Sequence, residues 1–71
     1  MEINIEALEE LLENKFNGNQ TLFAETIGLE RSHVNKVFCN KGRGAGATFC
    51  GAIIKYCNNN NLDYQEYIFL N

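Results

Sequence analysis

The chain lacks proline and tryptophan altogether, and its 71 residues include one histidine, one methionine and three cysteines. Without proline, nothing in the backbone forces a helix to end or to kink. Runs of β-branched residues, which favour strands, are also scarce. Hydrophobic residues nonetheless make up 45% of the chain, which is typical of a folded globular protein. These features together favour an all-α fold.

Long apolar runs are missing as well. No stretch approaches the roughly 20 consecutive apolar residues that a membrane-spanning helix needs. The first residues, MEINIE, are acidic where a secretory signal is basic. We therefore expect a cytoplasmic protein without a membrane partner.

The shortage of histidine and cysteine argues against catalysis and against a metal site. One histidine leaves no Ser/His/Asp set, and the carboxylates gather on one predicted helix face without residues that would form a cleft around them. Cys39, Cys50 and Cys57 lie eleven and seven positions apart, which matches no zinc-binding pattern. We expect no enzyme activity, no cofactor, no metal and no small-molecule ligand. We interpret the cysteines as small buried hydrophobic residues, with redox sensing as the alternative.

The net charge is −3, but the charges are unevenly distributed along the chain. Before residue 31 there are seven acidic residues and one base, Lys15. From residue 31 to 55 there are five bases and no acidic residue. The bases of this stretch are Arg31, Lys36, Lys41, Arg43 and Lys55. Such segregation indicates an anionic partner that is bound on one side of the protein.

Apolar residues at helical spacing predict five helices in one domain that covers residues 1–71. The expected ranges are about 4–15, 20–27, 31–39, 47–58 and 64–69. Asn19 is a suitable N-cap for the second helix, and Gly28 ends it. We expect the last helix to close the core with Tyr64, Tyr67, Ile68 and Leu70.

The second and third predicted helices have the spacing of a helix-turn-helix unit. Ala24 supplies a small residue where two steeply crossing helices pass closely, and Gly28 supplies the turn four residues later. Val34 and Val37 then anchor the inner face of the following helix. In such a unit the second helix enters the DNA major groove.

The segment NQTLFAETIGLERSHVNKVFCNKGR, residues 19–43, resembles the helix-turn-helix of Cro/CI-type phage repressors, also called XRE-like regulators. The resemblance implies a compact five-helix lambda-repressor-like domain that binds double-stranded DNA. It further implies a transcriptional regulator, a repressor of a phage, a prophage or another mobile element. Glu30 departs from the family pattern, because a serine that caps the recognition helix often stands at this position.

The resemblance also implies which side chains contact DNA. Base contacts would come from the early exposed residues of the recognition helix, which are Arg31, Ser32, His33 and Asn35. Backbone contacts would come from Gln20, Lys36, Asn40, Lys41 and Arg43. The chemistry is suitable independently of the family, because arginine pairs with guanine and asparagine with adenine.

Two further expectations concern partners. Small helix-turn-helix proteins bind DNA half-sites as symmetric dimers, so we expect a homodimer on DNA. The alternative function is a protein-interaction module with the same fold, such as an antitoxin-like or anti-repressor partner, without specific DNA contact. The overall acidity of the chain is the main support for that alternative.

Overall fold

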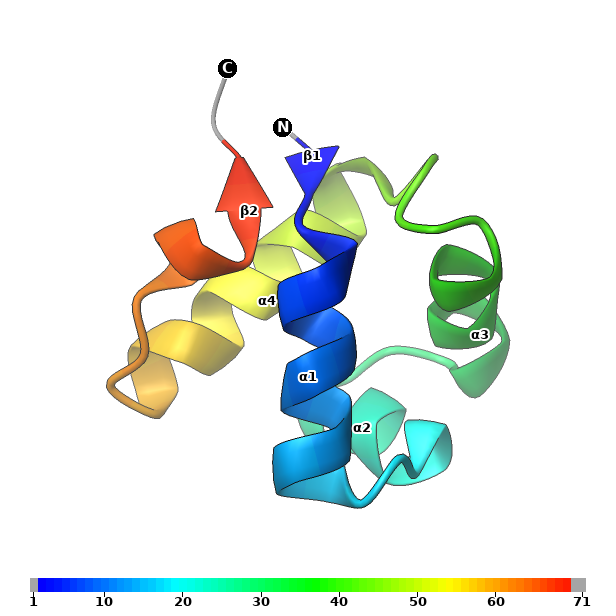
Figure 1. Ribbon diagram of the computed structural model, residues 1–71, viewed down its shortest axis with the longest axis horizontal. Coiled ribbons are helices and arrows are strands. Elements are labelled where there is room, and N and C mark those ends of the chain that lie inside the picture. The colour runs from blue at the N-terminus through cyan, green and yellow to red at the C-terminus, as the bar shows by residue number, and fades with distance from the viewer. Residues whose placement is uncertain (1, 70–71) are drawn as a thin grey trace.

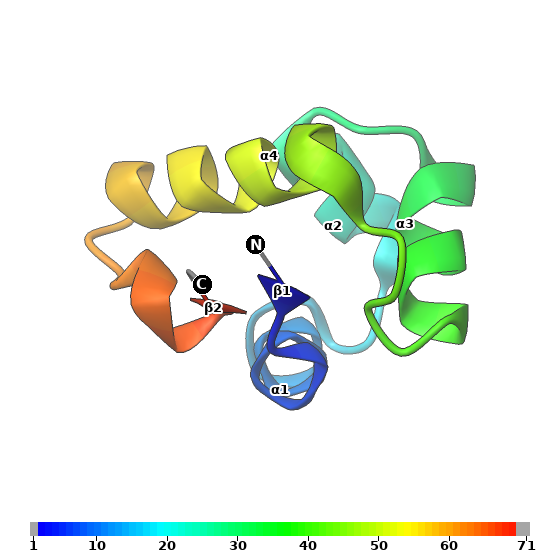
Figure 2. The same cartoon turned by 90° about the horizontal axis from the view of Figure 1, so that it is seen from above.

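The computed structural model describes residues 2–69 and shows a mainly helical protein (Figure 1). Figure 2 shows α4 and α1 on opposite sides of the core, with α3 at one end of the molecule. The elements in chain order are β1 (Glu2–Ile3), α1 (Ile5–Phe16), α2 (Gln20–Ile27), α3 (Arg31–Cys39), α4 (Gly46–Asn59), the 3-10 helix η1 (Tyr64–Glu66) and β2 (Ile68–Phe69).

The helix predicted over residues 64–69 is not confirmed. The chain there forms the single turn η1 and then the strand β2, which pairs antiparallel with β1 so that Ile3 lies opposite Ile68. Two hydrogen bonds favour this course: the Asn4 N–H donates to the Tyr67 carbonyl at 2.8 Å, and the Asn4 side-chain amide donates to the Glu66 carbonyl at 3.1 Å. Leu70, which we expected in the core, lies outside the described residues.

The core contains side chains from all four helices and from both strands. Phe23 of α2 is 0% exposed and lies between two other rings. Its ring centroid is 5.1 Å from that of Phe16 in α1 and 6.1 Å from that of Phe38 in α3, both edge to face. The other fully buried large side chains are Leu8, Val34, Phe49, Cys50, Ile53, Cys57 and Ile68.

Two of the three cysteines are buried, as expected, and the third is not. Burial raises the pKa of the Cys50 thiol and of the Cys57 thiol, and the carboxylates of Asp63 and Glu66 raise the pKa of Cys57 further. Both therefore stay neutral and act as small hydrophobic side chains. Cys39 is exposed, so its interpretation as a core residue is wrong.

The described residues contain neither a membrane-spanning helix nor a metal cluster. Between residues 2 and 69, no helix has the length and apolar character to cross a bilayer. The same part of the chain brings no three His, Cys, Asp or Glu side chains together as a metal site would require.

Candidate nucleic-acid interface

The sequence between Asn19 and Glu30 determines how α2 and α3 are joined. The Asn19 side chain accepts a hydrogen bond from the Leu22 N–H at 3.0 Å and so caps α2. At the other end Gly28 has a φ of 76°, and the Leu29 N–H donates to the Ala24 carbonyl at 2.9 Å. A Cβ at Gly28 would meet nothing within 4 Å among the described residues, so the left-handed backbone alone favours glycine there. The helices are thus joined by the three residues 28–30.

Glu30 occupies the N-cap position of α3 without capping it through its side chain. Its backbone is extended, and its carbonyl accepts from the N–H groups of His33 and Val34 at 3.1 and 3.2 Å. Its carboxylate makes no capping hydrogen bond to the described backbone. The exposed carboxylate contributes a negative charge at the first turn of α3, which a serine would not do.

Helix α3 has one buried face and one polar face. Val34, Val37 and Phe38 are buried against the rest of the protein. Because successive residues of an α-helix lie about 100° apart, the opposite face is formed by residues 32, 35, 36 and 39. The side chains on this face, Ser32, Asn35, Lys36 and Cys39, are all exposed. Helix α3 itself lies at one end of the molecule (Figure 2).

A hollow of about 350 Å³ lies where the N-terminus of α2 meets α3. Here the Asn35 amide nitrogen donates to the Gln20 side-chain oxygen at 3.1 Å. The first N–H groups of α2 and the Arg31 guanidinium give the hollow a donor-rich, positive character. It is lined by Gly18, Asn19, Gln20, Thr21, Arg31 and Asn35. The structure thus brings together three of the predicted DNA-contacting residues, Gln20, Arg31 and Asn35.

His33 is placed apart from the other predicted base-contacting residues. Its side chain is half-buried, and its ring centroid is 5.7 Å from that of Phe49 in α4, with the two planes at 62°. Such edge-to-face contacts stabilise packed elements. His33 therefore joins α3 to α4 and reaches the polar face of α3 only at its edge.

We expect His33→Ala to lower the free energy of unfolding by about 1 kcal/mol, because the ring contact with Phe49 is lost. Chemical denaturation followed by circular dichroism measures the change. Ser32→Ala, one residue away and exposed, is the matched control and should change stability by less than about 0.5 kcal/mol. Equal stability of the two variants would contradict a packing role for His33.

The loop after α3 presents the remaining predicted contacts to solvent. Asn40, Lys41 and Arg43 are exposed. Lys41 and Gly42 have φ values of 57° and 86°, and the Gly42 N–H donates to the Val37 carbonyl at 2.8 Å. A Cβ at Gly42 would lie 3.4 Å from the Ile3 Cβ, so the loop passes closely over β1. The loop is thereby held at the end of α3.

Beside this loop is a second hollow, of about 480 Å³. It is lined by Lys41, Arg43 and the loop glycines, and also by Glu2 of β1. The acidic side chain reduces the positive charge on the side of the loop that faces β1.

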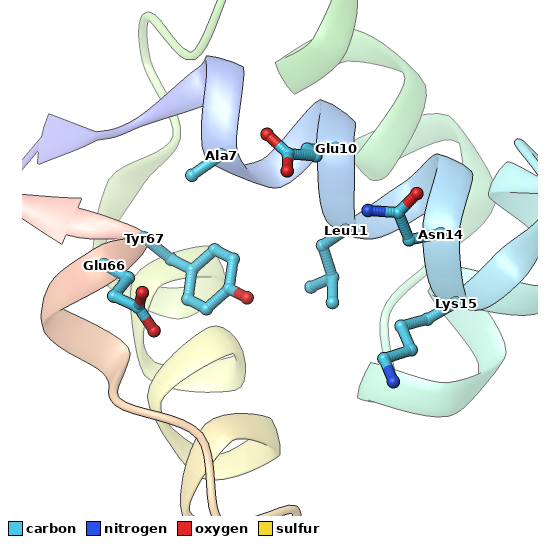
Figure 3. A pocket seen from close by; sticks show the side chains of 7 residues that line it. All are labelled: Ala7, Glu10, Leu11, Asn14, Lys15, Glu66 and Tyr67. Carbon is cyan, nitrogen blue, oxygen red and sulfur yellow. The ribbon is translucent and has the colours of Figure 1, made fainter.

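A third hollow differs in its charges and lies between α1 and the C-terminal segment (Figure 3). It measures about 210 Å³ and is lined by Glu10, Lys15, Glu66 and the Tyr67 ring, among others. Burial raises the pKa of the Tyr67 hydroxyl, and the Glu66 carboxylate raises it further. With two carboxylates and one amine around it, this hollow is unsuited to a polyanion.

Cys39 also belongs to the polar face of α3, although it was not predicted there from the sequence. Its thiol donates to the Asn35 side-chain oxygen at 3.5 Å. The spacing of four residues from Asn35 was a usable signal, because residues i and i+4 share a helix face. Its hydrophobic character pointed the other way, toward the core.

The comparisons with known proteins add nothing to this geometry: no family model matches the chain, and no curated protein or solved structure matches it significantly. The function must therefore be inferred from the arrangement of α2, α3 and the loop that follows.

Proposed function

We propose that this protein binds double-stranded DNA sequence-specifically, with α2 and α3 acting as a helix-turn-helix unit. The observation that carries the proposal is the exposed polar face of α3 at the end of the molecule. Three apolar residues hold the helix from behind, while Ser32, Asn35 and Lys36 project outward. An α-helix about 10–12 Å wide fits the B-DNA major groove, which is about 12 Å wide.

In this proposal Arg31 and Ser32 read base edges. Asn35 lies beside Arg31, and His33 lies at the edge of the interface. The Arg31 guanidinium is exposed and offers the forked donor pair that matches the guanine O6 and N7 atoms. Ser32, on the outermost line of α3, donates to or accepts from several bases. Sequence preference should therefore depend most strongly on Arg31.

The remaining contacts are to phosphates, which position the protein without reading sequence. Lys36, Lys41 and Arg43 supply positive charge, and Asn40 supplies a neutral donor. Gln20 and the first N–H groups of α2 line the hollow beside Arg31, where an anion is favoured by both dipole and charge. The proposed interface is thus basic, although the whole chain is acidic.

The regulatory role rests on the resemblance of residues 19–43 to Cro/CI-type regulators. A repressor of this kind occupies a two-fold symmetric operator as a homodimer, with half-sites one helical turn apart, about 34 Å. Selection of bound sequences from a random DNA pool tests this directly. A palindromic consensus is expected, and affinity should fall steeply as salt concentration rises. If no DNA is retained above background at low salt, the proposal fails.

We expect Arg31→Ala to remove most of the sequence preference. One bidentate contact to guanine contributes about 1–3 kcal/mol of discrimination against the wrong base. The measurement compares the affinities for the selected site and for single-base variants of it, at one fixed salt concentration. Lys55→Ala, which removes a charge from exposed α4 surface, should leave the preference unchanged. If Arg31→Ala still discriminates fully between the selected site and its single-base variants, other residues read the bases.

A protein-interaction module is the second candidate, because α1 carries a stripe of acidic side chains. Glu6, Glu10 and Glu13 are exposed and spaced four and three residues apart, so they share one face. A basic protein partner would suit that face. In this case the DNA selection would yield nothing, and reversing these charges would abolish partner binding.

A further inference from the structure

A chain of two side-chain hydrogen bonds links the polar face of α3 to the start of α2. The Cys39 thiol donates to the Asn35 oxygen at 3.5 Å, and the Asn35 nitrogen donates to the Gln20 oxygen at 3.1 Å. All three side chains lie at or beside the proposed interface. In the sequence, by contrast, Gln20 and Asn35 are fifteen residues apart.

In this pair of hydrogen bonds each donor lies on the Cys39 side and each acceptor lies on the Gln20 side. An amide oxygen only accepts and an amide NH₂ only donates, whereas a thiol is both a weak donor and a weak acceptor. In the structure the Asn35 oxygen accepts from Cys39, and the Asn35 NH₂ donates to Gln20. Gln20 must then present its oxygen to Asn35. The Gln20 NH₂ therefore does not bind Asn35, and the Gln20 side chain lines a hollow together with Arg31.

We infer that Asn35 is a positioning residue, which fixes the Gln20 amide as a hydrogen-bond donor toward a DNA phosphate. This inference rests on the proposed function and refines it. A phosphate oxygen accepts and never donates, so it matches an outward NH₂ and would be repelled by an outward amide oxygen. Gln20 and Asn35 thus act together in one contact to the DNA backbone.

The experiment is a double-mutant cycle on DNA affinity, measured on the selected site and on a single-base variant of it. Asn35→Ala and Gln20→Ala should each weaken both sites by the same factor, about ten- to a hundredfold, since one oriented hydrogen bond to a charged group is lost. The double variant should be no weaker than the weaker single variant, because the residues work through one contact.

A second measurement monitors the hydrogen bond between Asn35 and Gln20 in the absence of DNA. In nuclear magnetic resonance spectra, Gln20→Ala should shift the side-chain amide signals of Asn35, and Cys39→Ala should shift them as well. Glu25→Ala, at an exposed position of α2 outside this hollow, is the matched control and should leave them in place. Circular dichroism checks that each variant is folded.

The outcomes separate the two proposals. If Asn35→Ala weakens the selected site but not its variant, Asn35 reads a base; the inference is then overturned while DNA binding stands. Additive losses of DNA affinity in the double-mutant cycle would overturn the inference as well. So would Asn35 amide signals that stay unchanged in Gln20→Ala. If the wild-type protein binds no DNA, the proposed function fails and the role of Asn35 toward phosphate fails with it.

Discussion

Phe23→Ala is expected to remove a large part of the free energy of unfolding at 25 °C. The Phe23 ring is 0% exposed and contacts Phe16 and Phe38, so its removal opens a cavity where three helices meet. A buried Phe→Ala change costs about 3–5 kcal/mol. A domain of this length has a total stability of about 4–10 kcal/mol. Urea denaturation and thermal melting, both followed by circular dichroism, measure the loss.

Leu22→Ala is the matched control for Phe23→Ala. Leu22 is the preceding residue of the same helix, but its side chain is 46% exposed. Because little apolar contact is lost and alanine favours a helix, we expect a change of less than about 0.5 kcal/mol. If Phe23→Ala unfolds no more easily than Leu22→Ala, α2 is not the element that joins α1 and α3. The interface that depends on this packing would then need another explanation.

The sequence predicts α2 more accurately than the C-terminal segment, for a physical reason. Both ends of α2 are set by local residues, because Asn19 caps it and Gly28 ends it, and the predicted bounds are confirmed. The end of the chain depends on pairing between residues 2–3 and 68–69. Strands of two residues carry no periodicity, and their partners are remote in sequence. Apolar spacing within residues 64–69 gives no information about the hydrogen bonds that Asn4 donates to this segment.

In the candidate site, too, some positions follow from local sequence and others depend on residues that are remote in the sequence. Helical spacing is enough to place Ser32, Asn35 and Lys36 on the exposed side of α3. It could not place His33 against Phe49, which belongs to a different helix. The Gln20 to Asn35 hydrogen bond likewise depends on how α2 and α3 cross. Whether these residues contact DNA stays a prediction.

Reversal of the two loop charges is the most severe test of the interface. We expect Lys41→Glu with Arg43→Glu to weaken DNA binding by on the order of 100-fold, because two phosphate contacts become repulsions. The slope of log K against log salt should also become shallower by about 2. Both side chains are exposed, and glutamate is unbranched like lysine at position 41, where φ is 57°. The fold should therefore survive, and fluorescence anisotropy at several salt concentrations gives both quantities.

Lys15→Glu with Lys55→Glu is the control that distinguishes local contact from net charge. Each double variant replaces two bases by two acids, so both carry the same total charge. Lys15 lines the hollow between α1 and the C-terminal segment (Figure 3), and Lys55 lines one formed by the end of α2 and by α4. Neither belongs to the proposed interface. If DNA binding depends on the loop after α3, the control should lose only a few-fold in affinity through weaker long-range attraction. Equal losses in the two double variants would show that only total charge matters.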